Sequence, residues 1–314
     1  MSQTPRLLLI APSAMEHTPA FERAAALAQA MQLPLNIVAF DYLQALAVAG
    51  LFAPEQIRLA RDGYLRTHRQ WLTEQASLLA RHQIMVTSEV MWVQDPFAEI
   101  LQFINEMPLQ LIIKDVQHES VLERIFYTLL DWQLLRDCPV PVHLVTDDTH
   151  PRPRRVLAIV DVLRGEEQDC VFNDQIIDAA AQLAAQCDAS LDVVHVYDWT
   201  AVYATEMGFG ALPLATGIHE ALGTAQHEAF TALAERHGVP ASCRHFIEGA
   251  PVRSICEFAI NKQIDVIVMG TVQNHGLSKL LGTTAEQLLH RAPCSVLAIK
   301  PQPTLQSCNT NAPR

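Results

Sequence analysis

Short runs of apolar residues alternate along the chain with longer stretches whose apolar residues recur every three or four positions. Residues 156–160 (VLAIV) and 295–299 (SVLAI) are almost continuously apolar, as expected of parallel strands covered on both faces. Between such runs, one predicted helical face collects Ile176, Ile177, Ala180, Leu183 and Ala184. The alternation predicts an α/β fold in which helices cover both faces of a parallel sheet.

The second half of the chain holds a complete set of such elements. Its predicted strands are 156–160, 191–197, 243–247, 265–269 and 295–299, and its later helices begin near Pro251 and span 283–291. Five strands with intervening helices predict a doubly wound parallel sheet with the strand order 3-2-1-4-5.

The first half repeats the second. Residues 6–13 match 154–163, 94–104 match 249–260, 109–114 match 264–270, and 134–145 match 288–299. Because the offset stays nearly constant, we predict two tandem domains, 1–148 and 153–301, and a disordered tail over 302–314. The two copies are expected to pair as an intramolecular pseudo-dimer, and a further homodimer stays open.

Composition excludes several classes of protein. The formal charge of −12 argues against nucleic-acid binding, and the basic stretch 151–155 (PRPRR) is interpreted as a solvated linker. The seven cysteines form no CxxC pair and the 13 histidines form no HxH or HExxH spacing, so reduced thiols and no metal site are expected. No apolar run is long enough for a membrane span, and a cytoplasmic location is expected.

Ligands of open parallel sheets bind beyond the carboxyl ends of the strands, where the strand order reverses. For this order, the reversal lies between the first and fourth strands. The residues that follow those strands are Asp161 and Gly270 in the second half, and Ala11 and Lys114 in the first.

The stretch after Gly270 admits two interpretations. Gly276 and Gly282 interrupt it before Thr283 and Thr284 open a helix, so free amides, a helix dipole and two hydroxyls could bind a phosphate. Alternatively, residues 283–286 (TTAE) form a capping box that binds no ligand.

Several motifs in this order resemble those of the universal stress protein family, and of its tandem two-domain members in particular. They are 248–251 (EGAP), 266–271 (VIVMGT), 276–282 (GLSKLLG) and 292–300 (APCSVLAIK). The resemblance covers the chain apart from its tail. It implies an adenine nucleotide alpha-hydrolase-like fold and a cytoplasmic, non-catalytic role in survival of stress such as DNA damage, through small-molecule or protein binding.

The resemblance also implies an adenine-nucleotide site for ATP or ADP in the second half. The residues that match the family pattern are Asp161, Val196, Gly249, Gly270, Gly282 and Thr283. Gly276 and Thr284 of the same loop complete the predicted site. Gln273 stands in place of the family's second glycine. One strained residue and one lost charge-assisted bond would weaken binding by about two to three powers of ten.

The first half lacks this pattern. Lys114 is aligned with Gly270, Thr128 with Gly282, and Ala11 with the residue where the family has its acid. We expect no nucleotide there, and we expect Lys114 to pair with Asp115, Glu119 or Asp131.

Two long apolar segments, 41–63 and 198–218, follow the second strand of each half. Packing against the other domain or another chain is one interpretation. The other is a lid over an apolar ligand, lined by Trp199, Tyr203, Met207 and Phe209. An ATP-binding switch and a carrier of an apolar ligand therefore stand as alternative functions, with slow ATP hydrolysis or self-phosphorylation as a further option.

Overall fold

The computed structural model describes residues 4–42, 54–119, 124–126, 128–146, 150–162, 167–198, 216–275 and 278–301. The elements of the first unit are β1 (Arg6–Ala11), α1 (Pro19–Met31), β2 (Leu35–Asp41), α3 (Pro54–Leu79), η1 (Ala80–His82), β3 (Val86–Trp92), α4 (Pro96–Glu106), β4 (Leu109–Asp115), β5 (Gln117–Glu119), β6 (Arg124–Phe126), α5 (Leu129–Asp137) and β7 (Val142–Val145).

The second unit repeats this order. Its elements are β8 (Arg155–Ile159), α6 (Glu167–Cys187), β9 (Ser190–Tyr197), α8 (Thr216–Arg236), η3 (Ala241–Cys243), β10 (Arg244–Glu248), α9 (Pro251–Lys262), β11 (Val266–Gly270), β12 (Val272–His275), β13 (Ser278–Leu281), α10 (Thr283–Arg291) and β14 (Ser295–Ile299). Proline stands in the first turn of α1, α4 and α9, where its fixed φ favours helix initiation and its missing amide costs nothing.

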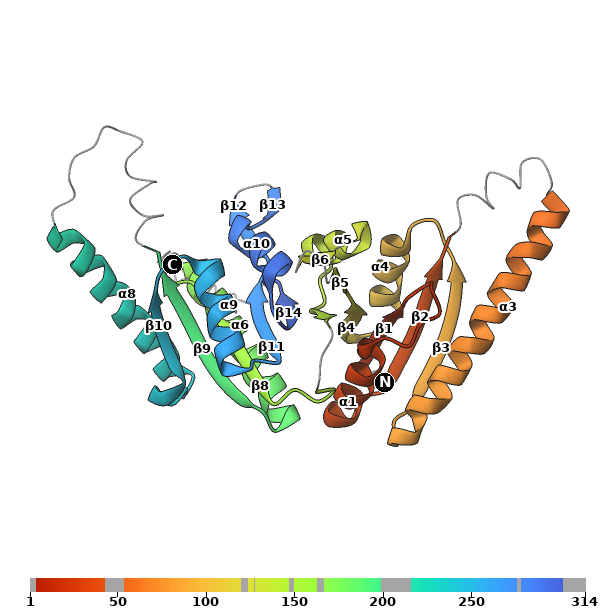
Figure 1. The fold of residues 1–314 in the computed structure, drawn as a ribbon, viewed down its shortest axis with the longest axis horizontal. Helices are drawn as coiled ribbons and strands as arrows, with labels where there is room; N and C mark the ends of the chain where they lie inside the picture. The colour runs from red at the N-terminus through yellow and green to blue at the C-terminus, as the bar shows by residue number, and fades with distance from the viewer. Residues whose placement is uncertain are drawn as a thin grey trace, which may run out of the picture.

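Ten of the described strands form one sheet, in the order β10-β9-β8-β11-β14-β7-β4-β1-β2-β3 (Figure 1). Strands within each unit are parallel and follow the predicted order 3-2-1-4-5. The units join where β7 pairs with β14 in antiparallel fashion, with His143 opposite Leu297. The predicted fold class is confirmed, and the pairing of the fifth strands makes the two sheets continuous.

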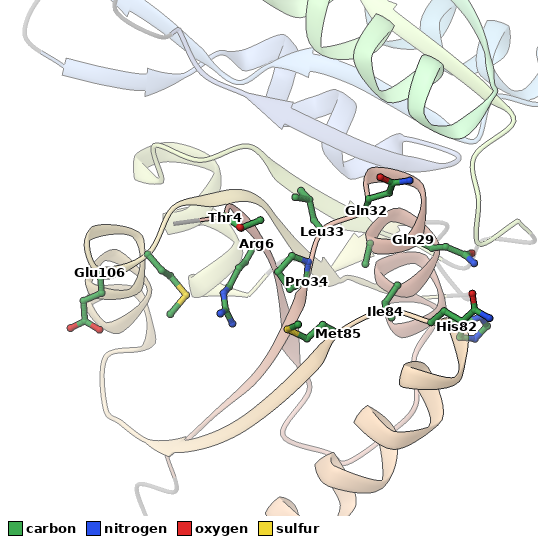
Figure 2. A pocket seen from close by; sticks show the side chains of 13 residues that line it. Thr4, Arg6, Gln29, Gln32, Leu33, Pro34, His82, Ile84, Met85 and Glu106 are labelled. Carbon is green, nitrogen blue, oxygen red and sulfur yellow. The ribbon is translucent and has the colours of Figure 1, made fainter. Parts of the chain in front are cut away.

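An open groove borders the amino ends of the strands in the first unit (Figure 2). It measures about 1040 Å³, and its lining includes Arg6 at the start of β1, Pro34 just before β2 and Met85 just before β3. The groove therefore lies at the end of the sheet opposite to the predicted ligand edge.

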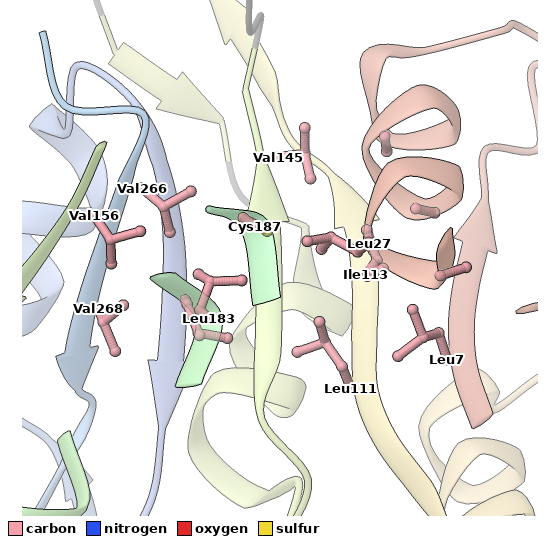
Figure 3. Close-up of a cluster of buried hydrophobic side chains, with 14 of the residues drawn as sticks. Leu7, Leu27, Leu111, Ile113, Val145, Val156, Leu183, Cys187, Val266 and Val268 are labelled. Carbon is pink, nitrogen blue, oxygen red and sulfur yellow. The ribbon is translucent and has the colours of Figure 1, made fainter. Parts of the chain in front are cut away.

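Each face of the sheet carries one core that runs through both units. Buried residues of α1, α3, α6 and α8 pack on one face, and those of α4, α5, α9 and α10 pack on the other. Figure 3 shows the first of these cores at the seam, where Leu27 of α1 and Leu183 of α6 lie near Ile113 and Val266 of the sheet. The core is therefore shared, and the two units are not separate globules.

The connection between the units is exposed at four of the five residues 151–155, as expected of a solvated linker, and it is also anchored by hydrogen bonds. Arg152 Nε donates to the carbonyl of Cys187 at 2.7 Å, and the guanidinium of Arg155 donates to the carbonyl of Lys262 at 2.6 Å. Asp265 accepts from the amides of residues 154 and 155 at 2.7 and 2.9 Å. These basic side chains satisfy carbonyls at the carboxyl ends of α6 and α9.

In both units, the connection from the fourth strand to the next helix forms a small antiparallel hairpin, β5–β6 or β12–β13. β6 lies beside α10 of the second unit, and β13 lies beside α5 of the first. The segment predicted as an open glycine loop is therefore a hairpin that faces the other unit.

None of the helices in the described part of the chain combines the length and apolarity that a membrane crossing requires.

Candidate functional site

The sheet order brings the main predicted site residues to one edge. β8 pairs with β11 and with β9. Asp161, two residues after the end of β8, and Gly270, which ends β11, therefore lie at neighbouring strand ends. Val196 lies in β9, half-buried and opposite Ile247 of β10. The carboxyl edge of the second unit is thus the candidate site.

Gly270 is required by a close aromatic contact. A Cβ on this residue would lie 2.6 Å from Cζ of Phe172 and 3.4 Å from Cδ1 of Ile176, both on α6. The first distance is too short for any real side chain, so the ring of Phe172 fills the space that glycine leaves free. Within this structure, Gly270 accommodates a ring of the protein itself.

The backbone of Asp161 is also engaged by α6. Asn173, which is 5% exposed, accepts from the amide of Asp161 at 3.0 Å and donates to its carbonyl at 2.7 Å. This two-way contact fixes the chain directly after β8. The main-chain donor and acceptor of Asp161 are therefore both satisfied within the protein.

Gly249 has a structural role in the turn from β10 to α9. Its φ is +149°, and a Cβ there would lie 2.7 Å from Oγ of Ser254. Its amide donates to the carbonyl of Tyr197 at 3.0 Å. The glycine predicted for this turn is thus explained by the backbone conformation and by a neighbouring helix.

The first turn of α10 differs from the predicted capping box. Gly282 is the N-cap with φ −66°, and it has no side chain to cap the helix, while Thr283 and Thr284 are the first two helical residues. The amide of Gly282 donates to the carbonyl of Thr271 at 3.3 Å. The capping-box prediction at residues 283–286 is wrong because the motif needs Thr283 as the N-cap, whereas the helix begins one residue earlier, with Gly282 as the N-cap. Gly276 lies outside the described residues.

Strand register corrects the alignment of the first unit. Asp115 pairs with Val145 as Gly270 pairs with Ile299, so Asp115, and not Lys114, occupies the position of Gly270. The same register places Pro12, and not Ala11, at the position of Asp161. Thr128 is confirmed as the counterpart of Gly282, because both are helix N-caps.

The first unit places its own carboxylates where a phosphate would be expected. Lys114 Nζ lies 3.0 Å from Oδ1 of Asp131, whose side chain is 1% exposed. The other oxygen, Oδ2, accepts from the amide and hydroxyl of Thr128 at 2.6 and 2.8 Å, completing a capping box. The predicted pairing of Lys114 with an acid is confirmed, and Asp131 and Thr128 together cap the amino end of α5.

Asp115 makes this edge still less suited to an anion. Burial raises the pKa of Asp115 above its usual value, and the positive charge of Lys114 offsets that rise only in part. A phosphate placed beside Asp115 would lose its own hydration and meet a buried carboxyl group.

Among the described residues of the whole chain, no cluster of histidine, cysteine and carboxylate side chains could hold a metal ion.

Sequence reasoning did not identify Phe172 or Asn173. The only signal was that Phe172 lies four residues before Ile176, on the helical face already predicted to be buried. That spacing indicates a buried ring but does not indicate which strand end the ring covers.

A second overlooked feature is a buried polar pair between the second strand and the long helix of each unit. In the first unit, Nδ1 of His68 donates to Oδ2 of Asp41 at 2.6 Å, and both side chains are at most 1% exposed. In the second unit, His195 contacts Gln226 at 3.0 Å. Burial raises the pKa of the nearby Tyr64, and the negative charge of Asp41 raises it further.

The proposed lid residues cannot be placed. Trp199, Tyr203, Met207 and Phe209 lie outside the described residues, so the apolar-ligand interpretation stays a prediction. The described ends of the two segments do not match a loop: residues 54–63 belong to α3 and 216–218 to α8. The groove of Figure 2 contains none of the predicted site residues.

Comparison with known proteins gives one consistent match. The model of the universal stress protein family matches residues 7–146 and 155–300. The chain is 26% identical over 303 residues to universal stress protein E of Escherichia coli (strain K12), covering 96% of this chain and 95% of that protein.

Two further relatives fit the same picture. The chain is 37% identical over 128 residues to universal stress protein A homolog 1 of Coxiella burnetii, covering 40% of this chain and 87% of that protein. A crystal structure of a putative universal stress protein from Pseudomonas aeruginosa UCBPP-PA14 superposes with a TM-score of 0.70 at 23% identity, covering 95% of this chain and 94% of that one. That structure supports the fold.

Proposed function

Because the chain belongs to the universal stress protein family, we propose that it is a tandem, non-catalytic member that acts in the cytoplasm by binding a small molecule or a protein during stress. The observation that carries this proposal is the fusion of two doubly wound units into one ten-stranded sheet. One chain then presents two sheet edges in a fixed arrangement, which suits a binding platform.

The non-catalytic part of the proposal is supported by how the polar groups of these edges are used. Lys114, Asp131 and Thr128 satisfy one another in the first unit. In the second unit, Asn173 satisfies the backbone of Asp161. An enzyme would need a nucleophile and a base oriented toward a shared open space.

A discontinuous phosphate assay tests this part. After long incubation of the purified protein with MgATP, we expect phosphate release no faster than in a protein-free blank. Release that scales with protein concentration and disappears in the Asp161→Ala variant would overturn the non-catalytic assignment.

The second candidate is an ATP-binding switch with one nucleotide, held by the second unit. Its supporting observation is the difference between the two edges: the second unit presents Gly270, and the first presents Asp115 at the same register position. Gln273, in place of the family's second glycine, is expected to weaken that site.

Calorimetric titration with MgATP tests this candidate. Asp161→Ala should weaken binding about 10- to 100-fold, because each lost charge-assisted hydrogen bond costs about 1.5–3 kcal/mol. Asp137→Ala, which removes an exposed carboxylate of the first unit, is the matched control and should bind as the wild type does. Equal binding by wild type and Asp161→Ala would place the nucleotide elsewhere.

The physiological role has its own test. We infer protection during stress such as DNA damage or growth arrest, and a deletion strain should survive such treatment less well than its parent. Restoration of survival by the wild-type chain would support the proposal, and unchanged survival of the deletion strain under both stresses would count against it.

A further inference from the structure

At the two residues that follow β8, every backbone donor and acceptor has a partner. The amide of Val160 donates to the carbonyl of Val194 at 3.1 Å, and Nδ1 of His195 lies 3.1 Å from the carbonyl oxygen of Val160. At Asp161, the side chain of Asn173 fills both roles: Oδ1 accepts from the amide at 3.0 Å, and Nδ2 donates to the carbonyl at 2.7 Å. Asp161 is therefore fixed by its backbone, although the residue itself is exposed.

Asn173 is buried, at 5% exposed, and it lies on a helix that is fastened elsewhere. Asp174, the next residue of α6, accepts from Nε2 of His237 at 2.7 Å and from Arg236 at 2.5 Å. Nδ1 of His237 lies 3.0 Å from Oδ1 of Asp178, one helical turn later. These contacts tie α6 to the end of α8, and a buried amide on a fixed helix has little freedom to reorient.

In the described part of the chain, the first unit has no equivalent of this contact. Strand register places Pro12 at the position of Asp161, and proline has no amide to donate. Counting back from the ends of α1 and α6 gives His17 as the counterpart of Asn173. His17 lies before α1, and its ring contacts side chains of α1 and α3 instead. The brace on the strand end therefore accompanies the unit for which a nucleotide site is proposed.

We propose that Asn173 is a positioning residue for a nucleotide bound at the carboxyl edge of the second unit, where it acts by fixing the backbone of Asp161. The inference rests on the proposed nucleotide-binding function, in which the carboxylate of Asp161 accepts from a hydroxyl or an amine of the nucleotide. Both polar atoms of the Asn173 side chain are bonded to Asp161, so Asn173 acts through that residue.

The effect expected of this brace is preorganisation. A carboxylate that is already held in place loses little conformational freedom when it binds a ligand, whereas a mobile one must be ordered at that moment. Without Asn173, the amide and the carbonyl of Asp161 would turn toward water, and each binding event would have to order the strand end again. Affinity should therefore fall, although no bond to the nucleotide is removed.

The test is calorimetric titration of the full chain with MgATP, comparing wild type with Asn173→Ala and Asn173→Ser. Both variants should bind about three- to tenfold more weakly, since ordering one side chain on binding costs that much affinity. Asn173→Ser leaves a small polar group beside the freed backbone groups, so it is the milder variant if the alanine variant does not fold. Circular dichroism confirms that each variant compared is folded.

A double-mutant cycle with Asp161→Ala separates positioning from a general loss of stability. Once the carboxylate is absent, Asn173 has nothing left to position, so Asn173→Ala should not weaken binding further in the Asp161→Ala background. A loss of the same size in both backgrounds would show that Asn173 acts independently of Asp161, and would overturn the inference.

Asn36→Ala is the matched control. Asn36 is likewise buried, and its side chain accepts from Thr87 at 3.0 Å, but it lies in β2 of the first unit, so this variant should bind as the wild type does. If wild type binds MgATP and both Asn173 variants bind equally well, the inference fails and the nucleotide site stands. If wild type does not bind at millimolar MgATP, both the inference and the nucleotide candidate fail.

Discussion

Arg23 and His143 show how single buried residues hold the two units together. Arg23 of α1 is fully buried, and its guanidinium donates to Nε2 of His143 at 3.3 Å and to the carbonyl of His150 at 2.9 Å. His143 in turn donates through Nδ1 to the carbonyl of Val296 in the second unit at 3.2 Å. The seam therefore depends on a neutral histidine beside a buried cation.

This histidine predicts an acid-sensitive fold. Burial, and then the charge of Arg23, lower the pKa of His143 from 6.5 to about 3. Between those two pH values, only the unfolded chain binds a proton at His143. The contribution of this residue to the free energy of unfolding is therefore fully present above pH 6.5 and is lost as the pH decreases. The loss from this group amounts to at most about 1.4 kcal/mol per pH unit.

The measurement is urea unfolding of wild type and His143→Gln from pH 7 to pH 4. The variant should lose less stability per pH unit, by up to one proton's contribution. His82→Gln, which removes an exposed histidine, is the control. Identical pH slopes for wild type and His143→Gln would contradict a neutral buried histidine.

At the level of the elements, the glycines of this chain serve different purposes. Gly249 begins the connection from β10 to α9 with φ +149°, and a Cβ there would meet Oγ of Ser254. Gly63 lies inside α3, where a Cβ would come no closer than 3.9 Å to Arg66. Backbone conformation and neighbouring atoms, and not the residue type alone, decide what a substitution does.

Alanine at the two positions should therefore have opposite effects. Gly249→Ala should destabilise the protein by about 1–3 kcal/mol, because an L side chain is strained at that φ and meets Ser254. Gly63→Ala should stabilise it by up to about 1 kcal/mol through helix propensity. Urea midpoints measure both changes, and a neutral Gly249→Ala would show that the turn relaxes.

The whole molecule behaves as one body because the contacts between the units are numerous and of several kinds. β7 pairs with β14, Thr271 Oγ1 donates to the carbonyl of Leu135 at 3.0 Å, and Lys300 Nζ donates to the carbonyls of Leu134 and Cys138 at 2.7 and 2.5 Å. The second unit thus caps the carboxyl end of α5 in the first.

We predict a single cooperative unfolding transition for the chain. Lys300→Met should lower its free energy of unfolding by about 1–3 kcal/mol, since buried carbonyls lose a charged donor. Lys262→Met, at an exposed lysine, should change it by less than about 0.5 kcal/mol. Scanning calorimetry and circular dichroism measure the number of unfolding transitions and the change in each variant. Two separate transitions in the wild type would refute a shared core.

Local sequence patterns indicated the elements and their repetition, whereas the strand order 3-2-1-4-5 was an expectation for the doubly wound fold class as a whole. Nearly continuous apolar runs indicated buried parallel strands, the helical spacing of Ile176, Ile177 and Ala180 indicated a buried face, and all three residues are buried. The repeated order of elements indicated two units. These features depend on neighbours in sequence, so they can be predicted without knowledge of distant contacts.

The tertiary structure decided how the units join and what fills the candidate site. Pairing of β7 with β14, the ring of Phe172 above Gly270 and the carboxylate of Asp131 at the start of α5 each join residues that are distant in the chain or in separate elements. Strand register, which shifts residue correspondences by one, placed Asp115 at the position in the first unit that is equivalent to Gly270. Space left by a glycine can be taken by a ligand or by the protein's own side chain, and only long-range packing determines which one occupies it.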